Sequence, residues 1–210
     1  NQFSSHVLLQ VAIENVAIYI IHSVFRNSGK IVSLDSKKRT DNFDGHFSEI
    51  QINDCIFKNI SAVGSGAVVD IFLTSNLFIK LNVSISHSSF YTNFATVKGG
   101  VLYFESDALL VYPNRNPNVL IQNCVFTDNF ASELGGCISS GDQVMLTVIA
   151  CQFTFTMNVW PKTDQKNVKA IFLASEGNTV LQNTSLTLKS WINSELNMVL
   201  ISPLKSLKDS

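Results

Sequence analysis

Apolar and polar residues follow one short arrangement that returns along most of this chain. The arrangement is apolar-x-apolar-x-x-small-x-Phe, and the segment from Ile50 to Phe57 shows it clearly. Apolar residues two apart lie on one face of a β-strand, whereas an amphipathic helix needs spacings of three and four. The pattern therefore predicts short strands and offers no helix.

The motif occurs six times, with Leu186 in place of Phe in the last copy and one apolar lapse at Thr179, and we call its last residue the anchor. By subtraction of their residue numbers, the anchors are 32, 33, 36, 27 and 33 residues apart. The anchors are Phe25, Phe57, Phe90, Phe126, Phe153 and Leu186. The apolar residues five positions before them are Ile20, Ile52, Ile85, Ile121, Val148 and Leu181.

A period of this length, built from strands, predicts a right-handed parallel β-helix of about six coils. Each coil pairs with the next at about 4.8 Å, and equivalent inward residues stack in columns that form the core. A β-sandwich is the alternative all-β fold, but it gives no reason for one motif to recur at this period.

The alternation breaks between the second apolar residue and the small residue of the motif. Polar pairs such as Asn53-Asp54 and Ser86-His87 stand there, and a bend restores the inward direction. We therefore expect a corner at this point, followed by a small Ser, Cys or Thr. His22 and His87 hold the same corner position two repeats apart, roughly 10 Å from each other. That separation favours exposed corner residues over a shared metal.

Glycines predict a second corner in the middle three repeats. They stand nine residues after the anchor, and a second glycine follows in two of the repeats. Glycine permits positive φ and close approach of backbones. These corner glycines are Gly66, Gly99, Gly100, Gly135 and Gly136.

One β-helix domain covers residues 1–210 in this interpretation and is a fragment of a longer chain. Three insertions interrupt its coils, at 36–47, 106–118 and 160–167. Loops on a rigid scaffold often carry binding sites. The alternative for each insertion is a side loop that packs against the coils.

The closest copies of the motif continue beyond the anchor. Phe90-Tyr91-Thr92-Asn93 precedes Gly99-Gly100-Val101-Leu102, and Phe126-Thr127-Asp128-Asn129 precedes Gly135-Gly136-Cys137-Ile138. This resembles the repeats of chlamydial polymorphic outer-membrane proteins, with related repeats in autotransporter passengers and large surface proteins of ciliates. The resemblance spans about residues 45–155. It implies surface display, adhesion or a structural fibre.

Composition narrows the function classes. Hydrophobic residues make up 46% and charged residues 15%, against about 25% charged in average chains. The net charge of −1 with no clustered basic face argues against nucleic-acid binding. No apolar run approaches the length of a transmembrane helix. We expect an extracellular or cell-surface location.

Two kinds of modification are candidates. Sequons begin at Asn59, Asn82 and Asn183, and a glycan requires an outward asparagine. Asn59 is the less certain of the three, because it can belong to an inward asparagine column. Cys124 and Cys151 hold equivalent positions in neighbouring coils, within the Cα range of a disulfide. The favoured interpretation is a small buried residue after the corner, with the disulfide as the alternative.

Catalysis has one weak candidate, the acids Asp41 and Asp44 near His46, and a solvated insertion is favoured there. We predict no catalytic residue, metal ligand or cofactor. The predicted function is a non-catalytic structural or adhesive module whose partners are glycans and, at its open ends, other chains or further coils of the same chain. It can stack end to end in a fibre. The alternatives are a carbohydrate-active enzyme of pectate-lyase-like fold and a viral or phage spike.

Overall fold

The computed structural model describes residues 7–11, 16–35, 46–73, 79–106, 117–133, 135–141, 144–156, 173–175 and 179–189. Within these ranges the chain forms 21 strands and no helix. No helix of the described residues has the length and apolarity needed to cross a membrane. The insertion at 160–167 and most of those at 36–47 and 106–118 lie outside the described ranges.

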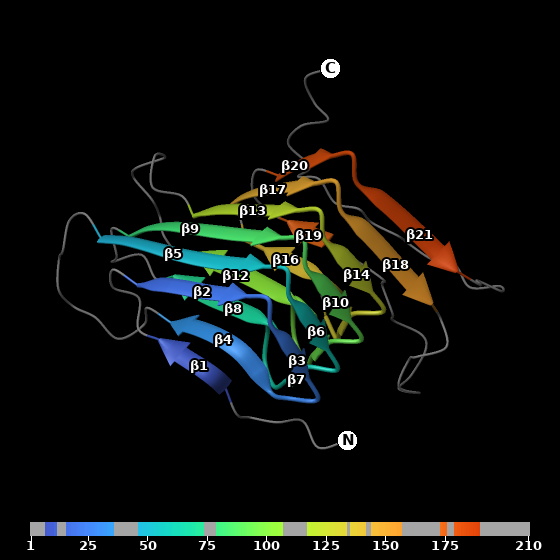
Figure 1. Cartoon of the computed structure of the whole chain (residues 1–210), viewed down its shortest axis with the longest axis horizontal. Helices are drawn as coiled ribbons and strands as arrows, with labels where there is room; N and C mark the ends of the chain where they lie inside the picture. The colour runs from blue at the N-terminus through green and yellow to red at the C-terminus, as the bar shows by residue number, and fades with distance from the viewer. Residues whose placement is uncertain are drawn as a thin grey trace.

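All pairings between the strands are parallel, and they build four sheets that we call A to D (Figure 1). Sheet A consists of β1 (Val7–Val11), β4 (Lys30–Asp35), β8 (Val69–Leu73), β12 (Leu102–Ser106), β16 (Ile138–Ser140) and β19 (Leu173–Ser175). Sheet B consists of β2 (Ala17–Ile21), β5 (His46–Asn53), β9 (Ile79–Ser86), β13 (Asn118–Gln122), β17 (Met145–Ile149) and β20 (Thr179–Gln182).

Sheets C and D follow sheet B along the chain in the middle repeats. Sheet C consists of β3 (Val24–Arg26), β6 (Ile56–Lys58), β10 (Ser89–Tyr91), β14 (Val125–Thr127), β18 (Gln152–Thr156) and β21 (Ser185–Lys189). Sheet D consists of β7 (Ser61–Ala62), β11 (Phe94–Ala95) and β15 (Phe130–Ala131). Successive strands of a sheet come from successive repeats, so the chain winds as a parallel β-solenoid. The predicted all-β solenoid is confirmed.

The motif residues stack in register from one repeat to the next. Phe57 aligns with Phe25 on one side and Phe90 on the other, and the alignment continues to the sixth anchor. Adjacent rings are nearly parallel, with centroids 5.1, 5.2, 4.7 and 4.8 Å apart. Phe57, Phe90 and Phe126 are fully buried. This column is therefore the centre of one core that runs along the solenoid.

The second apolar residue of the motif forms a parallel column in sheet B. Ile52, Ile85 and Ile121 are fully buried, as is Val148, whereas Ile20 and Leu181 at the two ends are partly buried against the same core. The alternation of buried and accessible residues in β13 and β17 follows directly from the pleat.

In the described part of each middle coil, two corners that the sequence predicted are made by residues with positive φ. The first corner, between sheets B and C, has φ values of 48° to 54° at His22, Asp54, His87, Asn123, Ala150 and Asn183. The glycine corner before sheet A uses Gly66, Gly99 and Gly135, at 57°, 61° and 64°. Gly100 is needed for close approach of the backbones, because a Cβ there would collide with the carbonyl oxygens of Gly136 and Phe130.

A further corner stands two residues after the anchor and was not anticipated. Asn27, Asn59, Thr92 and Asp128 have φ values of 51° to 56° there. Each of these residues donates its backbone N–H to a carbonyl of the next repeat, at 2.9 to 3.1 Å. The sequence predicted only the first corner and the glycine corner. The further corner separates sheet C from the short sheet D, so the middle repeats have four strands each.

Candidate functional site

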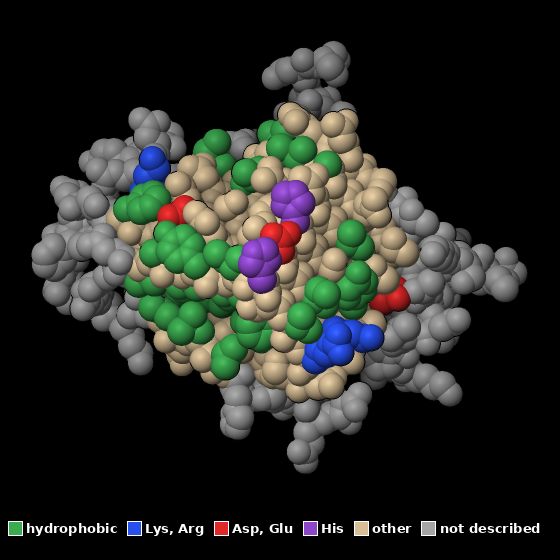
Figure 2. Space-filling view, viewed as in Figure 1, with side chains coloured by type: hydrophobic (Ala, Val, Ile, Leu, Met, Phe, Trp, Pro, Cys, Tyr) green, Lys and Arg blue, Asp and Glu red, His purple; other side chains and the backbone are tan. Residues whose placement is uncertain are grey.

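The first corner and the outer face of sheet B gather the exposed functional side chains of the described residues. At this corner, His22, Asp54 and His87 come from three successive repeats and occupy one column. Figure 2 shows two histidine side chains on this face with an acidic side chain between them. Because a parallel solenoid puts equivalent residues of adjacent coils about 4.8 Å apart, the three form a short row.

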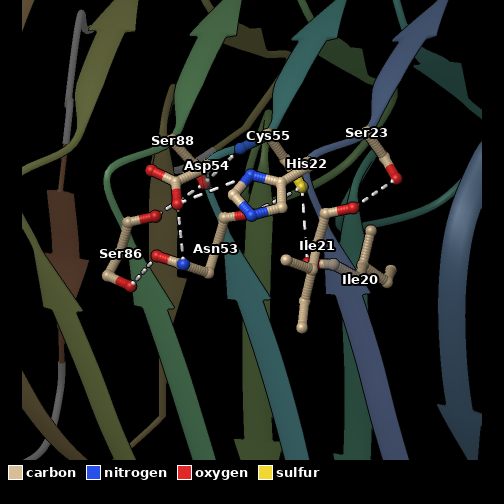
Figure 3. A network of polar contacts seen from close by, with 9 residues as sticks. All are labelled: Ile20, Ile21, His22, Ser23, Asn53, Asp54, Cys55, Ser86 and Ser88. Atoms are coloured by element: carbon tan, nitrogen blue, oxygen red, sulfur yellow. Dashed lines mark hydrogen bonds and ion pairs between the residues drawn. The ribbon is translucent and has the colours of Figure 1, made fainter.

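His22 and Asp54 face each other closely. The His22 Nδ1 and Asp54 Oδ2 atoms are 3.7 Å apart, and Figure 3 shows the imidazole beside the carboxylate. Asn53 donates its side-chain amide to the same Oδ2 at 2.8 Å. Both partners are accessible, with 75% of the His22 side chain and 43% of the Asp54 side chain exposed. His87 contacts the other neighbour in the column, since its Nε2 lies 3.2 Å from Asn123 Nδ2.

A shallow depression adjoins this row on the outer face of sheet B. Its volume is about 450 Å³. Ser86 donates its hydroxyl to Asn53 Oδ1 at 2.7 Å, which links two strands across its floor. Its lining consists of Ile21, Gln51, Ile52, Asn53, Asp54, Ser84, Ser86 and His87. Half of these residues carry amide or hydroxyl groups, and the others are two isoleucines, one acid and one imidazole.

An aromatic and acidic cluster stands beside the depression. Tyr19 donates its hydroxyl to Glu49 at 3.2 Å, and Gln51 donates its amide to the other oxygen of Glu49 at 2.7 Å. The hydrogen bond to Glu49 and the charge of Glu49 raise the pKa of Tyr19. The Tyr19 hydroxyl therefore stays protonated and keeps its donor at neutral pH.

Exposed apolar side chains are concentrated on the same sheet. Tyr19, Ile21, Phe47, Met145 and Val180 are 44% to 54% exposed, and all five belong to strands of sheet B. Green side chains beside the polar row in Figure 2 mark part of this surface. An exposed face of this kind commonly marks an interaction surface.

The cysteine column has a structural task. Cys124 and Cys151 are free, buried thiols, which corrects the alternative of a disulfide between them. Each sulfur donates to the carbonyl two residues earlier, Cys124 to Gln122 at 3.2 Å and Cys151 to Ile149 at 3.3 Å. Ser23, Ser88 and Thr184 make the same bond with their hydroxyls. A short side-chain donor closes the corner, so Ser, Cys and Thr are interchangeable here.

Cys124 and Cys137 are poorly reactive in this setting, whereas the hydrogen bond with Cys124 lowers the pKa of Cys151. The hydrogen bond with Cys151 and burial raise the pKa of Cys124. Burial likewise raises the pKa of Cys137. Because the thiolate is the reactive form, neither thiol is suited to nucleophilic chemistry in the folded protein.

The three sequon asparagines have different environments. Asn59 and Asn183 are exposed corner residues with positive φ. Asn59 therefore faces outward, and the idea that it joins an inward asparagine column is wrong. The inward column one residue later holds Ile60, Asn93 and Asn129 instead. Asn82 lies within β9, and its Oδ1 is shielded from solvent without a hydrogen-bond partner among the described residues.

The remaining acidic candidates do not converge. Asp41 and Asp44 lie outside the described residues, and His46 begins β5 rather than ending a loop. Asp70 pairs with the buried Lys30, which holds β8 to β4. Within the described ranges, no group of three or more His, Cys, Asp or Glu side chains could hold a metal ion.

Comparisons with known proteins give no relative. No protein-family model, no curated protein and no solved structure matches this chain.

Proposed function

We propose that this chain is a non-catalytic structural or adhesive module of a cell surface or extracellular material. Its architecture in this proposal is a right-handed parallel β-helix of six coils. Six strands in each of sheets A, B and C support the count. The strong preference of parallel crossovers for the right-handed sense supports the hand.

The observation that carries the proposal is that the inside of the solenoid is constant from repeat to repeat, whereas its outer face varies. The repeated motif is used in full for core columns and corners, as the buried anchors and positive-φ residues show. What varies between repeats is the outer face of sheet B. Repeat proteins commonly bind through such a broad surface, whose residues are free to change while the scaffold stays constant.

A carbohydrate-bearing surface fits the chemistry of this face best. Tyr19 and Phe47 offer exposed aromatic rings that can stack on sugar rings. Gln51, Asn53 and Ser84 line the depression with amide and hydroxyl groups that suit sugar hydroxyls. The repeats' resemblance to those of polymorphic outer-membrane proteins and autotransporter passengers supports the same surface role. Glycans at Asn183 or Asn59 would accompany it.

The ends of the sheets offer the second kind of contact in this proposal. An end strand such as β20 or β21 pairs on one side only among the described residues. Such an edge accepts a further coil of the same chain or a strand of another chain by main-chain hydrogen bonding. End-to-end stacking is the fibre form of this function.

Retention of the protein on a panel of insoluble polysaccharides tests the adhesive role. We expect retention on at least one of them, and loss of retention in a Tyr19→Ser, Asn53→Ala double variant. The control is Val24→Ser, which alters an exposed side chain of sheet C, 55% exposed, and leaves sheet B intact.

The same incubation separates adhesion from catalysis. New reducing ends or unsaturated products in the supernatant would identify an enzyme of pectate-lyase-like fold and overturn the non-catalytic assignment. Retention without product, abolished by the sheet B variant, agrees with an adhesive module. Equal retention of the double variant and the wild type would remove sheet B as the binding face.

A further inference from the structure

A lysine and an aspartate contact each other in sheet A, between the first two repeats. Lys30 begins β4, Asp70 lies within β8, and the two strands are neighbours in the sheet (Figure 1). The Lys30 Nζ atom contacts Asp70 Oδ2, and 9% of the Lys30 side chain and 18% of the Asp70 side chain are exposed. Lys30 is the one charged residue that is buried in the part of the chain that the structure describes.

Neighbouring groups shield this contact from water. Gly64 packs close to the ammonium, since a Cβ at that position would lie 4.0 Å from Lys30 Nζ. Tyr103 of β12 pairs in register with Asp70 and is 9% exposed. Their side chains therefore leave the same face of sheet A about 4.8 Å apart. The amine and the carboxylate are thus held together where little water can reach them.

We propose that Lys30 and Asp70 condense to an intramolecular isopeptide bond between Nζ and Cγ. Within the contact, the ammonium passes one proton to the carboxylate, which yields an amine and a carboxylic acid. The lone pair of Nζ then attacks Asp70 Cγ and forms the N–C bond, while the bond from Cγ to the hydroxyl oxygen breaks. The departing hydroxyl takes a second proton from the nitrogen and leaves as water. The reaction needs no other reagent.

Burial and contact both favour the amide over the ion pair. An ion pair that is nearly closed to solvent has to offset the lost hydration of two charges, and that loss can exceed their attraction. The amide carries no charge, and its formation releases one water molecule to solvent. Contact between nitrogen and carboxyl group makes the reaction intramolecular, which removes much of its entropic barrier. Lysine amines act as nucleophiles elsewhere when a pocket withdraws them from water.

The bond would join the first repeat to the second. Repeats of a solenoid contact only their neighbours, so opening can begin at an end coil. A covalent bond between β4 and β8 prevents these two coils from separating, and a cross-link also stabilises by restricting the unfolded chain. This role is independent of what the outer face of sheet B binds.

Mass spectrometry of the intact protein, unfolded only for the measurement, tests the bond. We expect the wild-type mass to be lower than the sequence mass by one water molecule. Trypsin should not cleave after Lys30, and the peptides that contain Lys30 and Asp70 should remain joined in one branched species. Lys30→Arg should have its full sequence mass, because a guanidinium stays protonated and cannot replace the amine as nucleophile.

The matched control is Lys58→Arg, which makes the same exchange at an exposed lysine of β6 and should keep the loss of one water. A cyclic imide at Asp70 also removes one water, but it would persist in Lys30→Arg and give no branched peptide. If Lys30→Arg does not fold, the wild-type mass and the branched peptide decide. A full sequence mass for wild type that circular dichroism shows to be folded, or loss of water in Lys30→Arg, would overturn the proposal.

Discussion

The anchor column and the first-corner column run through the same coils, three residues apart in each repeat, and they accept different chemistry. The anchor column holds phenylalanine in five repeats and leucine in the sixth. The corner column holds two histidines, two asparagines, an aspartate and an alanine. Stacking and burial restrict the first column to one kind of side chain, whereas only the backbone φ restricts the second.

This difference separates what specifies the fold from what is free to acquire function. A buried ring contacts rings above and below it, so a change in one coil affects its neighbours. A corner side chain points into solvent, and its substitution leaves the core unchanged. Functional side chains can therefore be introduced at the corner positions with little loss of stability. Substitutions in the two columns measure that cost.

The largest effect is expected from Phe90→Ala. Phe90 is fully buried, and its ring centroid lies 5.2 Å from that of Phe57 and 4.7 Å from that of Phe126. Removing a buried phenylalanine leaves a cavity, and we expect the free energy of unfolding to fall by about 3–5 kcal/mol. Urea unfolding followed by circular dichroism measures it.

Val24→Ala is the control for this experiment. Val24 stands one residue before the anchor Phe25, faces outward and is 55% exposed. We expect a loss of about 1 kcal/mol or less, mainly from the lower strand preference of alanine. Equal losses for the two variants would contradict the assignment of the anchor column to the core.

A smaller effect is expected from Asn93→Ala, in the inward column after the second corner. The Asn93 side chain accepts the N–H of Ile60 at 3.0 Å and donates to Phe57 O at 3.2 Å and to Asn129 Oδ1 at 2.9 Å. Alanine removes the side-chain partner of the Ile60 N–H and of the Phe57 carbonyl, at about 1–3 kcal/mol for each such loss, whereas Asn129 Oδ1 still accepts the backbone N–H of residue 93. We expect thermal unfolding to show a total loss of about 2–3 kcal/mol.

The outward Asn59 provides the contrast for Asn93. Asn59 is an exposed corner residue with φ of 56°, a conformation that glycine adopts readily. Asn59→Gly should therefore change the free energy of unfolding by about 0.5 kcal/mol or less. If Asn59→Gly were as damaging as Asn93→Ala, the inward and outward columns would have been exchanged.

The sequence predicts the inward columns well and the corners only in part. The recurring apolar residues and anchors determine the register of sheets B and C, because burial on one face allows no shift by one residue. The corner after the anchor was missed because Asn27, Thr92 and Asp128 share a backbone conformation and no side-chain type. Asn59 stands two residues after its anchor and Asn93 stands three residues after its own. Only the backbone conformation at the corner decides which of these two positions points inward.

The candidate site was missed for a related reason. The sequence places His22 and His87 two repeats apart, and it does not show whether the acid in the repeat between them faces either imidazole. The distance between His22 and Asp54 depends on side-chain orientation at the corner. The hydrogen bond of each cysteine to the corner carbonyl could not be predicted either. A thiol that closes a corner has the same column position as one that forms a disulfide.

The last expected effect, smaller than those of Phe90→Ala and Asn93→Ala, has the opposite sign and tests the corner column directly. Ala150 is exposed and has φ of 50°, although alanine pays roughly 1–2 kcal/mol for left-handed backbone. Ala150→Asn should raise the free energy of unfolding by about 0.5–1 kcal/mol, because asparagine tolerates this conformation. Ala17→Asn, at an exposed strand position of β2, should lower it instead, since asparagine is a poor strand former. Differential scanning calorimetry on the two variants decides between them. A loss of stability in both would mean that the corner, like the interior, is restricted by packing, and that its histidines and aspartate are not free to vary.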